Sequence, residues 1–281
     1  MAGPARVSRG QGKKGETERK DMDQALARYE IRGQAAVVTI DHPPLNALDV
    51  ATREALADVF AELDTRRADI RAVVLTGAGD KAFAAGADIK GFLELTPPIA
   101  KRRLMRSHAI SAIVENFEWP VIAALHGFCL GGGLELALCC DIRYASENTK
   151  LGFPEVNLSI FPGNGGTCRT RHNLPLGRLK ELVFTGEMIS AQEALQYGLI
   201  EKVVPNGEVV DAALALAGRI AGRGPLGVAA AKKVINRARN LTLNEGLELE
   251  SDFWAGLTAT EDMKEGARAF IEKRKPNYRC R

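Results

Sequence analysis

The chain has 281 residues, of which 46% are hydrophobic and 26% are charged, a composition typical of a globular protein with a sizeable core. The formal charge of +3 comes from residues 1–21, which hold six basic and three acidic side chains, so the rest of the chain is neutral. A neutral body excludes the strong positive field of most nucleic-acid-binding proteins, and we expect no nucleic-acid partner.

The cysteines and the longest uncharged stretch exclude further classes of protein. Five cysteines without a CxxC pair indicate neither a disulfide framework nor a zinc site, and they favour a reducing compartment. The longest uncharged stretch, residues 119–134, is short and interrupted by Pro120. It therefore predicts no membrane span and no membrane partner, and we expect a soluble protein.

The first residues form a polar segment without the apolar core of a secretion signal. We predict a disordered leader over residues 1–27. Its acid-free beginning weakly resembles a mitochondrial transit peptide, and Met22 is an alternative start of the ordered chain.

After the leader, apolar patterning alternates between short strands and longer helices. Strands are expected at residues 35–40, 71–76 and 120–126, and two more short strands frame residues 150–158. Helices are expected at 51–63, from Pro97 to 116 and at 134–140, and residues 191–273 are mostly helical. This order predicts an α/β fold with a helical end. Residues 77–82 formally match a dinucleotide-binding pattern, but no helix opens after them.

Glycines 131–133 lie between the third strand and the helix that carries Glu135. A helix start offers free backbone N–H groups, and glycine lets a ligand approach them closely. Such a junction can hold a developing oxyanion with main-chain atoms alone. The alternative is a tight strand–helix connection without a ligand.

Two glutamates lie among apolar neighbours. Glu135 is surrounded by leucine, alanine and cysteine in its helix, and Glu155 follows Phe153 and Pro154. Since burying an unpaired carboxylate is costly, the two invite a shared acid–base role. The alternative for Glu135 is a buried structural ion pair, for which Arg143 is a candidate.

Five ordered segments resemble one family. The main one, residues 122–141, reads IAALHGFCLGGGLELALCCD. The other four are residues 46–49 (NALD), 82–90 (AFAAGADIK), 153–155 (FPE) with Pro162 and Gly163, and 265–276. Together they resemble the enoyl-CoA hydratase/isomerase (crotonase) superfamily, in its hydratase branch, over about residues 28–279.

The resemblance implies an α/β fold with a crotonase-like ββα spiral core over residues 28–205. It also implies a helical C-terminal region over residues 206–281, which would oligomerise the protein and cover the active site. A homotrimer or a homohexamer is expected. The substrate would be an acyl-CoA thioester, whose coenzyme A enters as part of the substrate, with no other cofactor and no metal. We expect a cytoplasmic protein, or one of the mitochondrial matrix if the source is eukaryotic and the leader is a transit peptide.

The resemblance also assigns catalytic roles. The backbone N–H groups of Ala87 and Gly132 would form the oxyanion hole for the thioester oxygen. Glu135 would help to activate the water that adds at Cβ, Glu155 would exchange the proton at Cα, and Gly163 would orient the water through its backbone.

Further residues are implied for binding. Coenzyme A would be contacted by Ala85, Asp88, Ile89 and Lys90, and by Lys273 from a neighbouring subunit. Lys273 also fits a solvated helix end, where cations suit the helix dipole.

Two aromatic residues would line the substrate pocket. These are Phe153, where short-chain hydratases often have Gln, and Trp254 from the adjacent subunit, although Trp254 also fits a core position. Residues 168–172 depart from the family pattern as well, which leaves the acyl group open.

The leading hypothesis is therefore reversible hydration of a 2-enoyl-CoA to the 3-hydroxyacyl-CoA, with a water held by two glutamates. The alternatives are a hydratase for a cyclic or branched enoyl-CoA and an enoyl-CoA isomerase. A third alternative is an RNA-binding relative that uses a basic helix, but residues 51–67 mix basic and acidic side chains.

Overall fold

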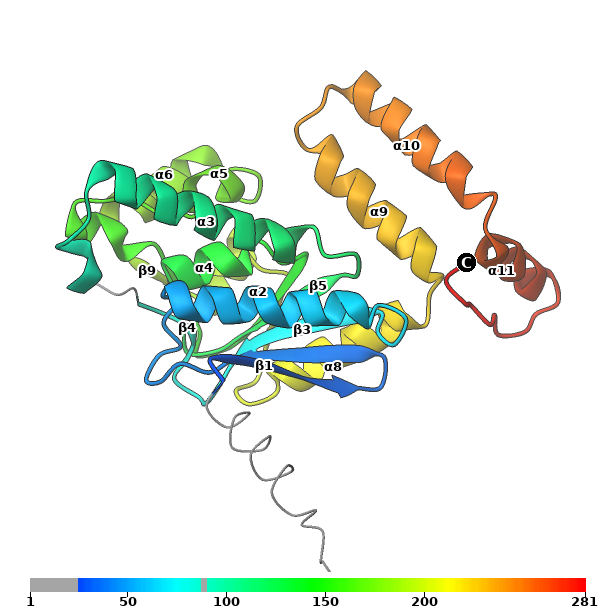
Figure 1. The fold of residues 1–281 in the computed structure, drawn as a ribbon, viewed down its shortest axis with the longest axis horizontal. Helices are drawn as coiled ribbons and strands as arrows, with labels where there is room; N and C mark the ends of the chain where they lie inside the picture. Colours follow the sequence, from blue (N-terminus) through cyan, green and yellow to red (C-terminus); the bar gives the residue numbers. More distant parts are fainter. Residues whose placement is uncertain (1–24, 87–89) are drawn as a thin grey trace, which may run out of the picture.

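The computed structural model describes residues 25–86 and 90–281, and in them the chain builds two β-sheets flanked by helices (Figure 1). The first sheet has six strands in the order β1-β2-β3-β5-β7-β10, and the second has four in the order β4-β6-β8-β9. The first sheet comprises β1 (Ala27–Arg32), β2 (Ala35–Ile40), β3 (Ala72–Gly77), β5 (Val121–Leu125), β7 (Ile142–Ser146) and β10 (Lys202–Val204). The second comprises β4 (Ala82–Ala84), β6 (Phe128–Leu130), β8 (Lys150–Gly152) and β9 (Met188–Ser190).

From β3 to β8 the chain alternates between the two sheets, one strand in each. In the first sheet β2, β3, β5, β7 and β10 run parallel, and β1 is antiparallel to β2. In the second sheet β4, β6 and β8 run parallel. This alternation, together with the helical C-terminal end, confirms the predicted α/β class with a ββα spiral core.

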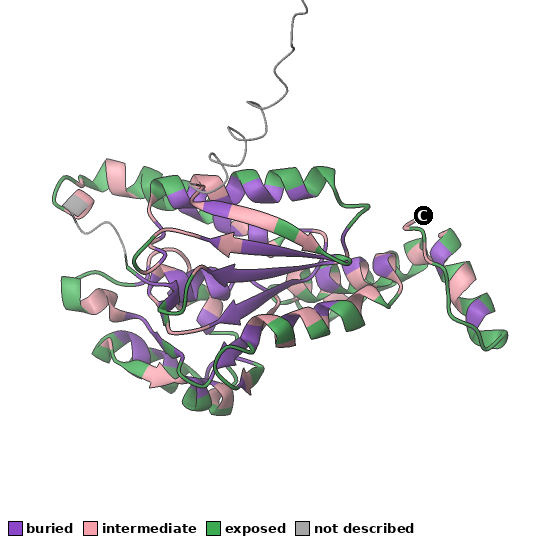
Figure 2. Ribbon diagram, turned by 90° about the horizontal axis from the view of Figure 1, so that it is seen from below, coloured by how far each residue is buried: buried purple, intermediate pink, exposed green. Residues whose placement is uncertain are grey.

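Both faces of the first sheet are buried, which explains why its central strands read as continuous apolar runs. Side chains such as Val37 and Val74 pack on one face against α8, and Val38 and Leu75 pack in the larger core on the other face. Figure 2 shows the buried strands enclosed by helices whose outer sides are exposed. The sheet is therefore a rigid base for the loops that leave its strands.

Helices and strands are interspersed as far as β10, and from α8 onward the helices follow one another without a strand between them. The α-helices are α2 (Val50–Thr65), α3 (Pro97–Glu115), α4 (Gly132–Ala137), α5 (Gly166–Thr170), α6 (Leu176–Thr185), α7 (Ala191–Tyr197), α8 (Val209–Ala221), α9 (Pro225–Ala238), α10 (Leu243–Leu257) and α11 (Glu261–Ile271). The described residues also form two 3₁₀ helices, η1 (Lys90–Phe92) and η2 (Pro154–Leu158). None of the helices in the described ranges is both long enough and apolar enough to cross a bilayer.

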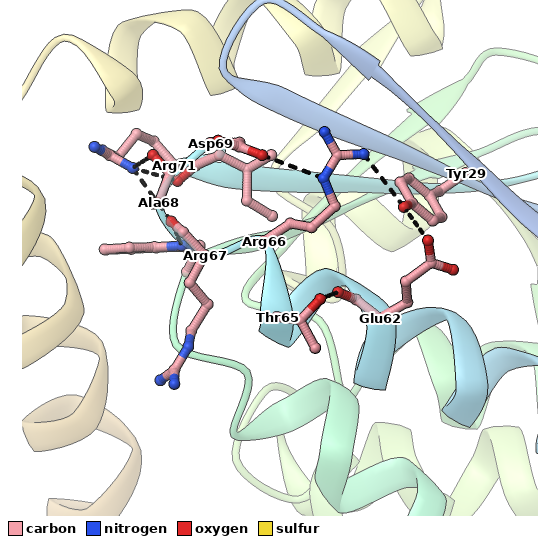
Figure 3. Close-up of polar contacts among 10 residues, drawn as sticks. Tyr29, Glu62, Thr65, Arg66, Arg67, Ala68, Asp69 and Arg71 are labelled. Atoms are coloured by element: carbon pink, nitrogen blue, oxygen red, sulfur yellow. Dashed lines mark hydrogen bonds and ion pairs between the residues drawn. The ribbon is translucent and has the colours of Figure 1, made fainter.

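Polar contacts fix both ends of α2. At its start, the side chain of Asp49 accepts a hydrogen bond from Thr52 N at 2.8 Å, which satisfies one free helix N–H. At its end, Tyr29 of β1 donates to Glu62 at 2.6 Å, and Arg66 contacts both Tyr29 and Asp69 (Figure 3). The helix is thereby held against the edge of the first sheet.

Helices α9, α10 and α11 form an arm that extends from the two sheets (Figure 1). In the single chain the arm leaves large apolar side chains exposed, with Trp254 at 69% and Phe270 at 86% of their surface. Isolated exposed apolar residues are ordinary on a protein surface, whereas this arm exposes several of them together.

The structure departs from the sequence-based expectations at several element boundaries. Strand β1 was not predicted, and it begins at Ala27, the last residue of the predicted leader, whose residues 1–24 lie outside the described ranges. Helix α4 begins two residues before the predicted 134 and ends at Ala137. Residues 150–152 are themselves a strand, and 154–158 form a 3₁₀ helix instead of a loop between two strands.

Candidate active site

The site is organised by the junction between β6 and α4. Gly131 has φ +53°, a conformation that side chains strongly disfavour, and its N–H donates to Gly152 O at 2.9 Å. A Cβ on Gly133 would lie 2.0 Å from Ala84 O, at the end of β4. The first turn of α4 therefore packs directly against the end of β4, where the chain continues toward residue 87.

We expect Gly133→Ala to lower the free energy of unfolding by about 3 kcal/mol or more, since a backbone carbonyl occupies the space of the new methyl group. Thermal unfolding should show a melting temperature lower by roughly 10 °C. Gly218→Ala in α8 is the control, because a Cβ there meets no atom within 4 Å. Equal melting temperatures for the two variants would contradict the close packing of α4 on β4.

The predicted oxyanion-hole residues are placed only in part. Gly132 is the first residue of α4, where backbone N–H groups have no partner within the helix. Ala87, together with Asp88 and Ile89, lies outside the described residues. Ala85 lies just after β4 and its N–H donates to Leu45 O at 2.9 Å, and Lys90 begins η1.

Glu135 is buried in the first turn of α4, as predicted, with 1% of its surface exposed. Its Oε1 accepts two backbone hydrogen bonds, from Asn164 N at 2.7 Å and from Gly166 N at 2.9 Å. Arg143, the ion-pair partner considered from the sequence, instead binds Glu201 at 2.5 Å, so that interpretation was wrong. The Glu135 carboxyl group is therefore held by backbone N–H groups, and the spacing of residues in the sequence does not reveal such partners.

The Glu155 carboxyl lies beside the α4 junction. Its Oε1 is 2.8 Å from the position that a Cβ on Gly131 would occupy, and its buried Oε2 has no hydrogen-bond partner among the described residues. Burial raises the pKa of Glu155 to about 7, a bond from its own backbone opposes this, and the nearby Glu135 charge adds to it. The two glutamates, 20 residues apart in sequence, thus face one small region.

The loop over residues 163–166 is fixed from outside the site. The His108 imidazole donates through Nε2 to Gly163 O at 2.7 Å. Arg169 donates to Asn164 O at 3.1 Å and forms an ion pair with Glu115 at 2.8 Å. This bracing keeps the N–H groups of residues 164 and 166 directed at Glu135.

The two residues predicted to line a substrate pocket lie in different parts of the molecule. Phe153 is fully buried under the loop, with its Cε1 2.8 Å from the position of a Cβ on Gly166. Trp254 belongs to α10 of the arm, and Lys273 follows α11; both helices lie away from α4 (Figure 1). The expected roles of Trp254 and Lys273 therefore require a second subunit.

One buried charge next to the site was missed by the sequence analysis. The Arg53 side chain comes from α2, and its Nη2 lies 2.8 Å from the position of a Cβ on Gly132. The signal was present, because residue 53 shares the helical face of the apolar Leu56, Phe60 and Leu63. Within the described ranges, no group of three or more His, Cys, Asp or Glu side chains is arranged to hold a metal ion.

Comparison with known proteins identifies the family of this chain. A sequence profile described as Enoyl-CoA hydratase/isomerase matches residues 30–281, so the chain belongs to the enoyl-CoA hydratase/isomerase (crotonase) family. The predicted family resemblance is thereby confirmed.

Individual relatives match over nearly their full length. The chain is 42% identical to a short-chain-enoyl-CoA hydratase of Clostridium acetobutylicum, over 88% of this chain and 94% of the relative. It is 39% identical to a crotonyl-CoA hydratase of Syntrophomonas wolfei, over 89% of this chain and 96% of the relative. The crystal structure of an enoyl-CoA hydratase from Bacillus anthracis superposes with a TM-score of 0.86 at 38% identity, covering 91% of this chain and all of that one.

Proposed function

We propose that this protein hydrates a short 2-enoyl-CoA to the 3-hydroxyacyl-CoA, reversibly. The observation that carries the proposal is the pair of carboxyl groups, Glu135 and Glu155, at the first turn of α4. Hydration needs a water and a proton delivered to neighbouring carbons, and two carboxyl groups can serve both. The names of the relatives, short-chain-enoyl-CoA and crotonyl-CoA hydratases, support the same substrate class.

In the proposed reaction the water oxygen forms a bond to Cβ, and the π electrons of the double bond move toward the thioester carbonyl. The protonated Glu155 gives its proton to Cα, and Glu135 accepts the proton that the water loses. The next bound water returns the proton from Glu135 to Glu155. The thioester itself supplies the electrophile, so the scheme needs no cofactor beyond the coenzyme A of the substrate.

The remaining roles follow the family resemblance. The N–H groups of Ala87 and Gly132 would stabilise the enolate-like oxygen, and one such donor is typically worth about 3–4 kcal/mol. Gly163 would orient the water through its backbone. Ala85, Asp88, Ile89 and Lys90 would contact coenzyme A of the same subunit, and Phe153 would bound the acyl pocket.

Crotonyl-CoA tests the proposal, because the ultraviolet absorbance of its conjugated thioester disappears on hydration. Rapid loss of absorbance with formation of 3-hydroxybutyryl-CoA is expected. Conversion to a 3-enoyl isomer would support the isomerase alternative instead. If the protein hydrates only bulky, branched or cyclic 2-enoyl-CoAs, the proposed reaction is correct and the proposed short-chain substrate is wrong.

The raised pKa of Glu155, about 7, predicts the same pH profile of kcat/KM for hydration and for dehydration. Hydration requires the protonated carboxyl, so kcat/KM should fall as the pH rises through about 7. Dehydration of 3-hydroxybutyryl-CoA starts from the same pair with its one proton on Glu135, and the equilibrium constant of hydration does not depend on pH, so its kcat/KM should fall in parallel. Initial rates in both directions between about pH 6 and about pH 8 provide the check, and two flat profiles would contradict the role of Glu155.

We further propose a homotrimer or homohexamer in the cytoplasm, or in the mitochondrial matrix if the leader is a transit peptide. The exposed apolar side chains of the arm support an assembly, and Trp254 and Lys273 would reach the site of a neighbouring subunit. Light scattering should give a mass three or six times that of the chain, and a monomer at micromolar concentration would overturn this part.

A further inference from the structure

Arg53 is a buried cation that the proposed reaction has not used. Only 8% of its surface is exposed, and its Nε donates to Leu48 O at 3.1 Å. The structure describes two other buried cations, and each is paired: Arg143 with Glu201 at 2.5 Å and Lys232 with Asp141 at 2.8 Å. For Arg53, no carboxylate of the described residues lies within ion-pairing distance.

Such a placement is unfavourable for the folded protein on its own. Burial lowers the pKa of Arg53, and the attraction of Glu135 offsets part of that effect. The guanidinium also lies against Gly132, where the free N–H groups of the first turn of α4 are themselves electropositive. A buried charge without an ion pair costs several kcal/mol unless other negative charge compensates it.

Two negative charges act on Arg53, one before the proposed reaction and one that develops during it. One is the Glu135 carboxylate, whose attraction already acts on the guanidinium in the free protein. The other is the enolate-like oxygen, which would accept a hydrogen bond from Gly132 N–H. A fixed positive charge beside a developing anion stabilises the transition state more than the ground state.

We propose, resting on the proposed function, that Arg53 is a positioning residue that holds the Gly132 backbone and favours the enolate by its charge. The side chain needs no contact with substrate, because it acts through the Gly132 N–H and through the electric field at the thioester oxygen.

A purely structural role makes a different prediction. If the bond from Nε to Leu48 O were all that mattered, removal of the charge would lower the melting temperature and leave kcat of the folded protein unchanged. If the field matters, Arg53→Met should lower kcat by roughly 10- to 100-fold, with KM changed less than about threefold. Arg53→Lys keeps the positive charge but loses the planar guanidinium group, so its kcat should lie between those of the wild type and Arg53→Met.

A spectroscopic readout separates the field from folding. Acetoacetyl-CoA has an acidic Cα–H, and its enolate has an ultraviolet band of its own. We expect wild-type protein to shift bound acetoacetyl-CoA toward the enolate and Arg53→Met to lose most of that band while still binding coenzyme A. Arg66→Met is the matched control, since it removes an exposed arginine from the other end of α2 (Figure 3).

The outcomes are distinct. Loss of the enolate band and of kcat in Arg53→Met, with partial recovery in Arg53→Lys and no change in Arg66→Met, supports the proposal. An unchanged band in folded Arg53→Met overturns it. If Arg53→Met does not fold, Arg53→Lys and Arg53→Gln give the same comparison. If wild type forms the enolate but does not hydrate crotonyl-CoA, the proposed substrate fails and the Arg53 comparison still stands. If wild type forms no enolate, the proposal for Arg53 falls.

Discussion

Replacing Glu155 by Gln should lower hydration of crotonyl-CoA by roughly 10³-fold and leave coenzyme A binding unchanged. The amide keeps the size of the side chain beside Gly131 but holds no acidic proton to give to Cα. Steady-state kinetics on the purified variant, with KM and kcat measured separately, provide the check. Glu115→Gln is not a suitable control, because Glu115 braces the loop at residue 164 through Arg169. Glu62→Gln, at the far end of α2, is suitable.

The same substitution should stabilise the fold in mildly alkaline solution. The folded-state pKa of Glu155, about 7, lies above the ordinary 4.5, so the folded protein loses stability as the pH rises from about 4.5 to about 7. Glutamine does not ionise, so at pH 8 the free energy of unfolding of the variant should exceed that of the wild type by about 1–2 kcal/mol. This figure allows for the partial exposure of the Glu155 carboxyl. A variant that is both inactive and less stable at pH 8 would contradict the assignment of a functional, unpaired carboxyl.

Much of this fold could be predicted from the sequence, because buried parallel strands leave uninterrupted apolar runs. The runs at residues 35–40 and 71–76 became β2 and β3 within one residue at each end. Strand β1 was missed since it lies at the edge of its sheet, where its polar residues Arg28 and Glu30 alternate with apolar ones and only one side packs. The early start of α4 depends on the positive φ of Gly131, which a sequence pattern does not reveal.

The site was predictable in its residue types but not in its contacts. Glu135 drew attention because it is a carboxylate within an apolar helix, and the structure confirms its burial. Its partners are backbone N–H groups of a loop 29 and 31 residues away in sequence, which depend on the fold. Arg53 was counted only among the basic side chains of the mixed range 51–67, although its position one turn before Leu56 places it on the buried face.

Arg53 also bears on the alternative of a nucleic-acid-binding relative. The range considered for that role, residues 51–67, covers α2 and the turn that follows it, and its three arginines are all engaged within the chain. Arg53 is buried, Arg66 contacts Asp69, and Arg67 contacts Glu118. A helix without free cationic side chains on one face makes few favourable contacts with the phosphates of a nucleic acid. The absence of a nucleic-acid partner stays a prediction, for which a gel shift at physiological salt is the test.

Gly131→Ala should lower activity by roughly 10²-fold through the geometry of the site alone. The new methyl group would lie 2.8 Å from Glu155 Oε1, closer than atoms in contact allow, so the carboxyl must move away from the water that it serves. The residue also has φ +53° with ψ −123°, a region left to glycine, which adds about 1–3 kcal/mol of backbone strain.

Gly33→Ala separates these two effects. Gly33, in the turn between β1 and β2, also has a positive φ, of +62°, and a Cβ there meets no atom within 4 Å. It should therefore lose stability from backbone strain while it keeps full activity. If Gly131→Ala lowers kcat no more than Gly33→Ala does, the carboxyl of Glu155 is not held against the α4 junction during turnover. If only Gly131→Ala loses activity, and its pH profile shifts as well, the junction sets both the place of the Glu155 carboxyl and its affinity for the proton. That result would tie the geometry of one glycine to the acid–base chemistry of the pair.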